Sequence, residues 1–134
     1  MRHLPVVILT AIAWLVPAAH AREQTELRDR IRDGVQRTDK DLGNYVHRDK
    51  LDEAQRKKFD AVVEDFDKLR QALAAGKWEN ERERLERAVD NIDFLAKHAP
   101  IEEADRQTLG IDVYTLQVIL DAWKAQSTGA PGKN

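Results

Sequence analysis

The chain has 134 residues, of which 22 are Lys or Arg and 24 are Asp or Glu, and its formal net charge is −2. This near balance argues against a nucleic-acid-binding protein, because the binding faces of such proteins are usually rich in basic residues. The sequence contains no cysteine, which excludes disulfides, thiolate nucleophiles, thiolate metal ligands and c-type haem attachment.

The first 21 residues have the pattern of a secretory signal peptide. Arg2 and His3 precede an apolar run over residues 4–16, and small residues occupy the A-x-A positions of Ala19-His20-Ala21. The run is shorter than the roughly 20 residues that a membrane-spanning helix needs. We therefore expect cleavage near Ala21 and a periplasmic or secreted mature chain, with an uncleaved membrane anchor as the alternative.

Two amphipathic helices are predicted in the first half of the mature chain, because apolar residues recur there three and four positions apart. The first is expected over residues 25–47, where Gly34 and Gly43 weaken it, since glycine costs a helix interior about 1 kcal/mol relative to alanine. The second opens at Asp52, whose carboxylate can cap the first turn. Gly76 is expected to end this helix in the left-handed conformation.

Two further helices are predicted in the second half. The third is expected to start at Trp78 and to end before Pro100, because proline disfavours helical geometry in the preceding residue. The fourth runs from Glu102 to about Lys124, with Gly110 as the expected place for a kink. From residue 126 the chain has no apolar surface to bury, so we predict a helical domain over 22–125 and a disordered tail over 126–134.

The second and fourth helices are related by an internal repeat with an offset of 50 residues. Leu51-Asp52-Glu53-Ala54-Gln55-Arg56 is echoed by Ile101-Glu102-Glu103-Ala104-Asp105-Arg106, and the apolar positions that follow coincide. With no strand pattern, this predicts an all-α, antiparallel up-down-up-down four-helix bundle made of two repeated helical hairpins. A homodimer in which hairpins pair between chains is the alternative. The copies differ where Asp112 replaces Val62, Trp123 replaces Leu73 and Gly110 replaces Asp60.

This topology predicts which residues gather at the two ends of the bundle. Trp78 and Trp123 share one end with Leu27 and Leu73, and Tyr45, His47, Leu51, His98 and Ile101 share the other. These ends are the predicted binding regions. His47 and His98, with Asp49 nearby, could form a surface zinc or copper site. Solvated histidines near helix C-termini, where the dipole favours them, are the commoner arrangement, so we expect neither metal nor cofactor.

Two polar residues interrupt the predicted apolar stripes. Asp112 lies between Leu109 and Leu116, and Asn91 occupies a flank position on the third helix. A buried carboxylate is costly unless it is paired, so we expect Asp112 at the edge of its stripe or beside an arginine or Tyr45.

Several enzyme classes are excluded by missing residues. The chain has no Glu-x-x-His pair for a di-iron site and no glycine-rich phosphate loop, and its first serine is Ser127. We therefore expect a protein without catalytic activity.

The stretch Leu51-Asp52-Glu53-Ala54-Gln55-Arg56-Lys57-Lys58-Phe59 resembles the Leu-Thr-x-x-Gln motif of small helical periplasmic proteins that act as ATP-independent chaperones or stress-signalling inhibitors. Those proteins carry the motif twice near helix starts, whereas acids replace both threonines here and Asp105 replaces the second glutamine. The resemblance implies an exported chaperone-like or regulatory binder that can dimerise through an apolar concave face.

The leading hypothesis is thus an exported, non-enzymatic helical bundle that binds a protein partner as a chaperone, regulator or adaptor. The alternatives are a ligand or metal carrier that uses the end with His47 and His98, and a structural component of the cell envelope.

Overall fold

The computed structural model describes residues 3–128 of the chain, with side chains described for residues 18–127. Its elements are α1 His3–Tyr45, the 3₁₀ turn η1 Arg48–Lys50, α2 Glu53–Ala74, α3 Arg82–His98 and α4 Glu103–Thr128. No strand occurs over residues 3–128, which confirms the all-α class. Within the same range, no helix is long and apolar enough to cross a membrane. The predicted signal segment, 1–21, falls mostly on residues whose side chains are not described.

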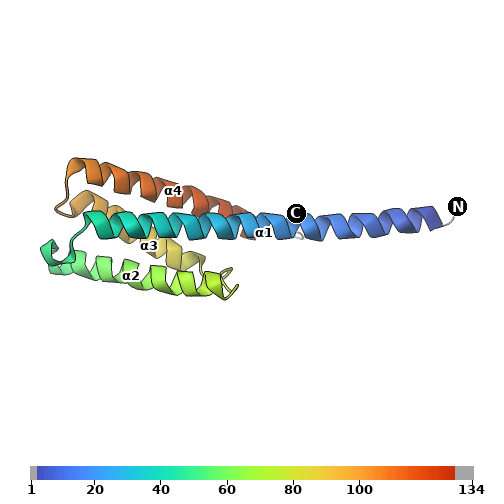
Figure 1. Ribbon diagram of the computed structural model, residues 1–134, viewed down its shortest axis with the longest axis horizontal. Helices are drawn as coiled ribbons and strands as arrows, with labels where there is room; N and C mark the ends of the chain where they lie inside the picture. The colour runs from blue at the N-terminus through green and yellow to red at the C-terminus, as the bar shows by residue number, and fades with distance from the viewer. Residues whose placement is uncertain (1–2, 129–134) are drawn as a thin grey trace.

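The four helices pack as an up-down-up-down bundle, which confirms the predicted architecture (Figure 1). α1 packs against α4, α4 against α3, and α3 against α2, whereas α1 and α2 touch more sparsely. The bundle is therefore tightly closed along three seams and looser along the fourth. Of the two predicted hairpins, α3 and α4 form the more closely packed one.

The core consists of apolar side chains from all four helices, and the repeat is visible in it. Phe66 of α2 and Leu116 of α4, which are 50 residues apart, are both fully buried. The same holds for Val35 and Leu85. Other members of the core are Leu27, Ile31, Leu42, Leu69, Ile92, Leu95, Leu109, Ile119, Leu120 and Trp123.

Three of the predicted helix boundaries are wrong. α3 starts at Arg82, because Trp78 lies in the preceding loop, where its buried ring packs against the core. α1 is longer than predicted and runs without a break through Gly34 and Gly43. α4 continues to Thr128, so the predicted disorder is wrong for residues 126–128, and residues 129–134 lie outside the described part. α4 also continues without interruption through Gly110.

The predicted ends of α2 are confirmed. The Asp52 carboxylate accepts a hydrogen bond from the backbone N–H of Gln55 at 2.7 Å, and the Gln55 side chain accepts one from the Asp52 N–H at 3.1 Å. This reciprocal arrangement is a capping box. At the other end, Gly76 has a φ of +70°, which only glycine adopts without steric cost.

Both copies of the repeated sequence also hold the C-terminal end of α3. Gln55 donates through its Nε2 to the carbonyl oxygen of His98 at 3.0 Å. Arg106 donates to the carbonyl oxygens of Ala96, Ala99 and Ile101. The last carbonyl groups of a helix have no N–H partners within the helix, so these side chains supply the missing hydrogen-bond donors. The residues of the repeated sequence therefore have a structural role of their own.

Candidate functional site

The predicted aromatic end of the bundle is formed, but its rings are part of the core. Trp78 and Trp123 are both buried and contact each other. Tyr45, from the opposite end, is half-buried and packs against the core. The two indole rings therefore belong to the core, whereas the Tyr45 ring is partly exposed.

The predicted histidine end does not assemble a metal centre. His47 and Asp49 are exposed, and the His98 ring contacts the Phe94 ring in a tilted arrangement, with centroids 4.6 Å apart and planes inclined at 48°. Over the described residues, no group of three or more His, Cys, Asp or Glu side chains is positioned to hold a metal ion.

The two polar residues of the stripes have different surroundings. Asn91 is half-buried on α3, as expected of a flank position. Asp112 is only 3% exposed, so the expectation that it lies at the edge of its stripe is wrong. It occupies the inward position of its repeat equivalent, Val62, which is fully buried. An arginine, Arg37, does act on Asp112, but the two form no ion pair among the described residues, and one oxygen of Asp112, Oδ2, has no hydrogen-bond partner there.

Asp112 is held in an unfavourable electrostatic environment. The pKa of Asp112 is raised to about 7, first by burial and then by a hydrogen bond with the carboxyl group of Asp41 on α1 and by the charge of that group, while the positive charge of Arg37 acts in the opposite direction. Asp65 on α2 makes an instructive contrast, because its buried carboxylate has arginine partners, Arg84 at 3.1 Å and Arg87 at 3.4 Å. Asp65 has the compensation that buried charges normally have, and Asp112 lacks it.

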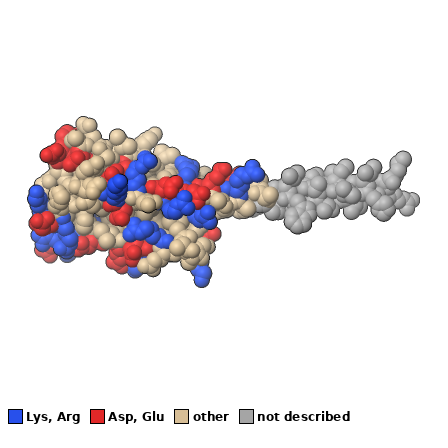
Figure 2. All heavy atoms as spheres, viewed as in Figure 1, with Lys and Arg blue, Asp and Glu red and all other residues tan. Residues whose placement is uncertain are grey.

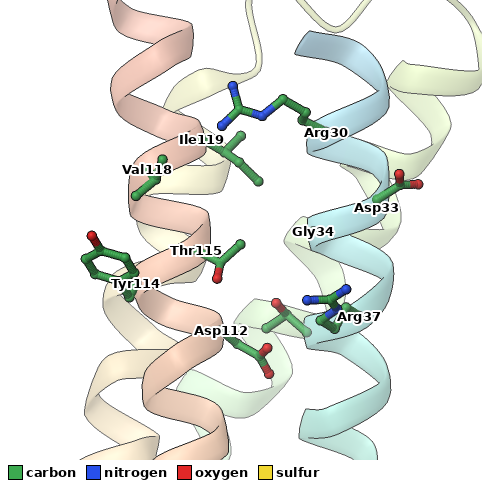
Figure 3. Close-up of a pocket in the computed structure, with 10 residues that line it drawn as sticks. Arg30, Asp33, Gly34, Arg37, Asp112, Tyr114, Thr115, Val118 and Ile119 are labelled. Atoms are coloured by element: carbon green, nitrogen blue, oxygen red, sulfur yellow. The ribbon is translucent and has the colours of Figure 1, made fainter. Parts of the chain in front are cut away.

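Asp112 lines a groove of about 370 Å³ between α1 and α4. In Figure 3 its carboxyl group points from α4 towards α1, beside Arg37. Arg30 extends across the other end of the groove, above Ile119. Between these ends the wall of α4 is formed by Thr115, Val118 and Ile119.

Gly34 brings the two helices together at the floor of this groove. A Cβ atom on Gly34 would lie 2.8 Å from Ile119 Cδ1 and 3.0 Å from Leu116 Cδ2, both closer than normal van der Waals contact. The glycine that weakens the predicted first helix therefore allows α1 to lie directly on α4.

The outer face of α4 carries an apolar stripe next to the groove. Ile111, Tyr114 and Val118 are 64%, 71% and 40% exposed, and they follow one another at helical spacing on one side of the helix. Tyr114 points away from α1, onto the outer surface (Figure 3). We refer to these three residues as the α4 stripe.

The repeat provides an internal reference for the α4 stripe. Fifty residues earlier, α2 has Glu64 and Lys68 where α4 has Tyr114 and Val118, and the two α2 side chains form an ion pair at 2.9 Å. Between Arg106 and Asp121, the only charged residue is the buried Asp112. The exposed surface of α4 has thus lost the charges that its counterpart retains. Comparing the two copies for charge, and not only for apolar pattern, would have revealed this surface from the sequence.

Charges of opposite sign flank the α4 stripe on its two sides. The groove on the α1 side is lined by Arg30, Arg37 and one acid, Asp33, and on the α3 side a second depression is lined by Asp90 and by Asp93, which is paired with Lys97 at 2.9 Å. Elsewhere on the face seen in Figure 2 the two signs are intermixed, and the surface over α4 is mostly uncharged beyond the acids at its start.

The chain matches no protein-family model, no curated protein and no solved structure.

Proposed function

We propose that this protein is an exported, non-catalytic helical bundle that binds another protein through the α4 stripe. The observation that carries the proposal is the replacement of the Glu64–Lys68 ion pair on α2 by exposed Tyr114 and Val118 on α4, with exposed Ile111 beside them where α2 has Ala61. Side chains of this type on a surface that has lost its charges are characteristic of protein interfaces, where aromatic residues supply much of the binding energy. The predicted signal peptide supports export.

The shape and charge of the surface favour an amphipathic helix as the partner. A second helix can lay an apolar face against a stripe of this spacing, as in other helix-in-groove contacts. Because Arg30 and Arg37 lie on one side and Asp90 and Asp93 on the other, the bound helix would carry acidic residues towards α1 and basic residues towards α3. Such complementary charges fix orientation and accelerate association more than they add affinity.

The proposal assigns no acid–base catalysis to Asp112 and Asp41, although two neighbouring carboxyl groups can share a proton. No histidine, serine or cysteine lies among the residues that line the groove beside Asp112. The Leu-Thr-x-x-Gln resemblance points to the same class of function, although Gln55 and Arg106 have structural roles here.

Site-specific photocrosslinking in the producing cell tests the proposal. A photoreactive phenylalanine analogue at position 114 is expected to give one defined crosslinked product, and the crosslinked peptide is expected to be an amphipathic helix with acidic and basic flanks. The same analogue at Gln71, on the exposed face of α2, is the matched control and should give no such product. Val118→Asp should abolish the product.

Two other outcomes would overturn the proposal. A crosslink to a second copy of the chain would indicate a self-associating structural component, and equal crosslinking at positions 71 and 114 would remove the role of the α4 stripe. The intact mass of the exported protein tests the predicted signal-peptide cleavage separately, since cleavage after Ala21 leaves Arg22 as the first residue.

A further inference from the structure

The groove between α1 and α4 has two polar ends, Asp112 and Arg30, whose charged groups form no ion pair with a described residue. At one end, the Oδ2 atom of Asp112 is buried and accepts no hydrogen bond in the described part of the chain. At the other end, Arg30 forms no ion pair with a described residue, whereas Asp33 between them is already paired with Arg32 at 3.3 Å. An unpaired buried carboxyl oxygen costs about 1–3 kcal/mol or more, so a ligand that donates to it recovers that free energy.

The distance between these ends is set by the helix. Arg30 and Arg37, which flank the two ends, are seven residues apart on α1, which corresponds to a rise of about 10 Å. Figure 3 shows Ile119 and Thr115 on the α4 wall between the ends. The intervening wall is therefore mainly suited to an aliphatic chain.

We propose that this groove binds a small zwitterion with separated charges, of the ω-amino acid class. Its ammonium group would donate to Asp112, its carboxylate would bind the guanidinium of Arg30, and its methylene chain would lie along Ile119 and Val118. A volume of about 370 Å³ is within the range of small-molecule sites. The site is distinct from the α4 stripe, although Tyr114 and Val118 border both.

The charged groups around Asp112 are consistent with an ammonium ligand. Asp41 and Arg37, both on α1, are the charged groups that act on Asp112, and Arg37 does so without forming an ion pair with it. A cation at Asp112 would therefore lie near two carboxyl groups, those of Asp112 and Asp41, and one guanidinium group, that of Arg37.

Binding of 6-aminohexanoate to the exported protein tests the proposal, with hexylammonium and hexanoate as ligands that each lack one charged end. Titrations followed by amide chemical shifts are expected to show changes at Gly34, Thr38 and Thr115. The zwitterion is expected to bind about tenfold more tightly than either single-charge ligand, which is the effect of one additional charged contact.

Two variants separate the two ends of the site. Asp112→Asn should weaken 6-aminohexanoate and hexylammonium by about tenfold and leave hexanoate unchanged, and Arg30→Gln should weaken 6-aminohexanoate and hexanoate and leave hexylammonium unchanged. Lys40→Gln, at an exposed position on the same helix but outside the groove, is the control and should change none of the three. Thermal unfolding by circular dichroism verifies that each variant is folded.

The proposal is overturned if the three ligands bind with equal affinity, if the shift changes lie away from the groove, or if no ligand binds. It is also overturned if the two variants affect all ligands alike. None of these results depends on the protein partner, so the two proposals fail or succeed separately.

Discussion

The indole rings of Trp78 and Trp123 meet edge to face, with ring centroids 5.5 Å apart and planes inclined at 65°. This contact joins the loop before α3 to the last part of α4. It closes one end of the bundle with two of the largest side chains in the protein, and edge-to-face pairs add about 0.5–1.5 kcal/mol beyond their buried area.

Trp123→Ala is expected to lower the free energy of unfolding by about 3–5 kcal/mol, because it removes a fully buried ring and leaves a cavity. Urea unfolding followed by far-ultraviolet circular dichroism measures the loss. A double-mutant cycle with Trp78→Ala should give a coupling energy of about 0.5–1.5 kcal/mol. A coupling near zero would mean that the rings contribute only through burial.

Gly110→Ala is expected to stabilise the protein by up to about 1 kcal/mol, because the new Cβ meets open space and alanine favours the helix. Gly34→Ala should gain less, since its Cβ displaces the ends of the Ile119 and Leu116 side chains, and the larger Gly34→Val should destabilise. Thermal and urea unfolding of the three variants test this order. Equal stabilisation by both alanine variants would show that α1 and α4 separate freely at Gly34.

Asp112 gives the stability of the protein a defined pH dependence. Its pKa is raised to about 7 in the folded state, from an ordinary value near 4, so the folded protein binds a proton between these values that the unfolded chain does not. The contribution of Asp112 to stability is therefore largest below about pH 4 and falls as the pH rises towards 7, by up to about 4 kcal/mol in all.

Asp112→Asn isolates this effect, because the amide resembles the protonated carboxyl group. The variant should be more stable than the native protein at about pH 8, and the difference should shrink towards zero near pH 4. Urea midpoints across this range provide the measurement. A stability difference that does not change with pH would contradict the raised pKa of Asp112 in the folded protein.

Arg106→Ala is expected to destabilise the protein by about 1.5–3 kcal/mol, since three carbonyl groups at the end of α3 lose a charged donor. Arg56, the equivalent residue of the first copy, is exposed and provides the matched control. Arg56→Ala should change stability by no more than about 0.5 kcal/mol. Urea unfolding of the pair tests whether the two copies have diverged in this role.

The bundle and most of its core could be predicted from the sequence, because apolar spacing determines which face of each helix turns inward. The two ends of α2 could also be predicted, because Asp52 can cap the first turn of a helix and Gly76 can adopt the left-handed conformation that ends one. The predicted start of α3 was wrong because of Trp78. Spacing alone cannot distinguish an apolar residue in a loop from the first residue of an apolar helical stripe. The start of α3 depends on tertiary packing of that ring.

The site was less predictable for a different reason. Asp112 stood out as an unusual residue, but its burial depends on how closely α1 approaches α4, and Gly34 sets that approach. The sequence does not indicate that Gly34 and Asp112 lie at the same contact between α1 and α4. The α4 stripe was also missed, although the loss of charge relative to Glu64 and Lys68 was present in the sequence.

The looser contact between α1 and α2 divides the helices into two kinds. α3 and α4 each have two closely packed neighbours, whereas α1 and α2 each have one, and an exposed ion pair between Asp39 and Arg70 at 3.1 Å spans the seam between them. Exposed ion pairs weaken with added salt. Amide hydrogen exchange should therefore be slowest in α3 and α4, where it requires global unfolding, and faster in α1 and α2, where opening of the seam is sufficient. Opening along this seam would leave the α4 stripe intact, so the proposed binding surface would persist while the other side of the bundle opens.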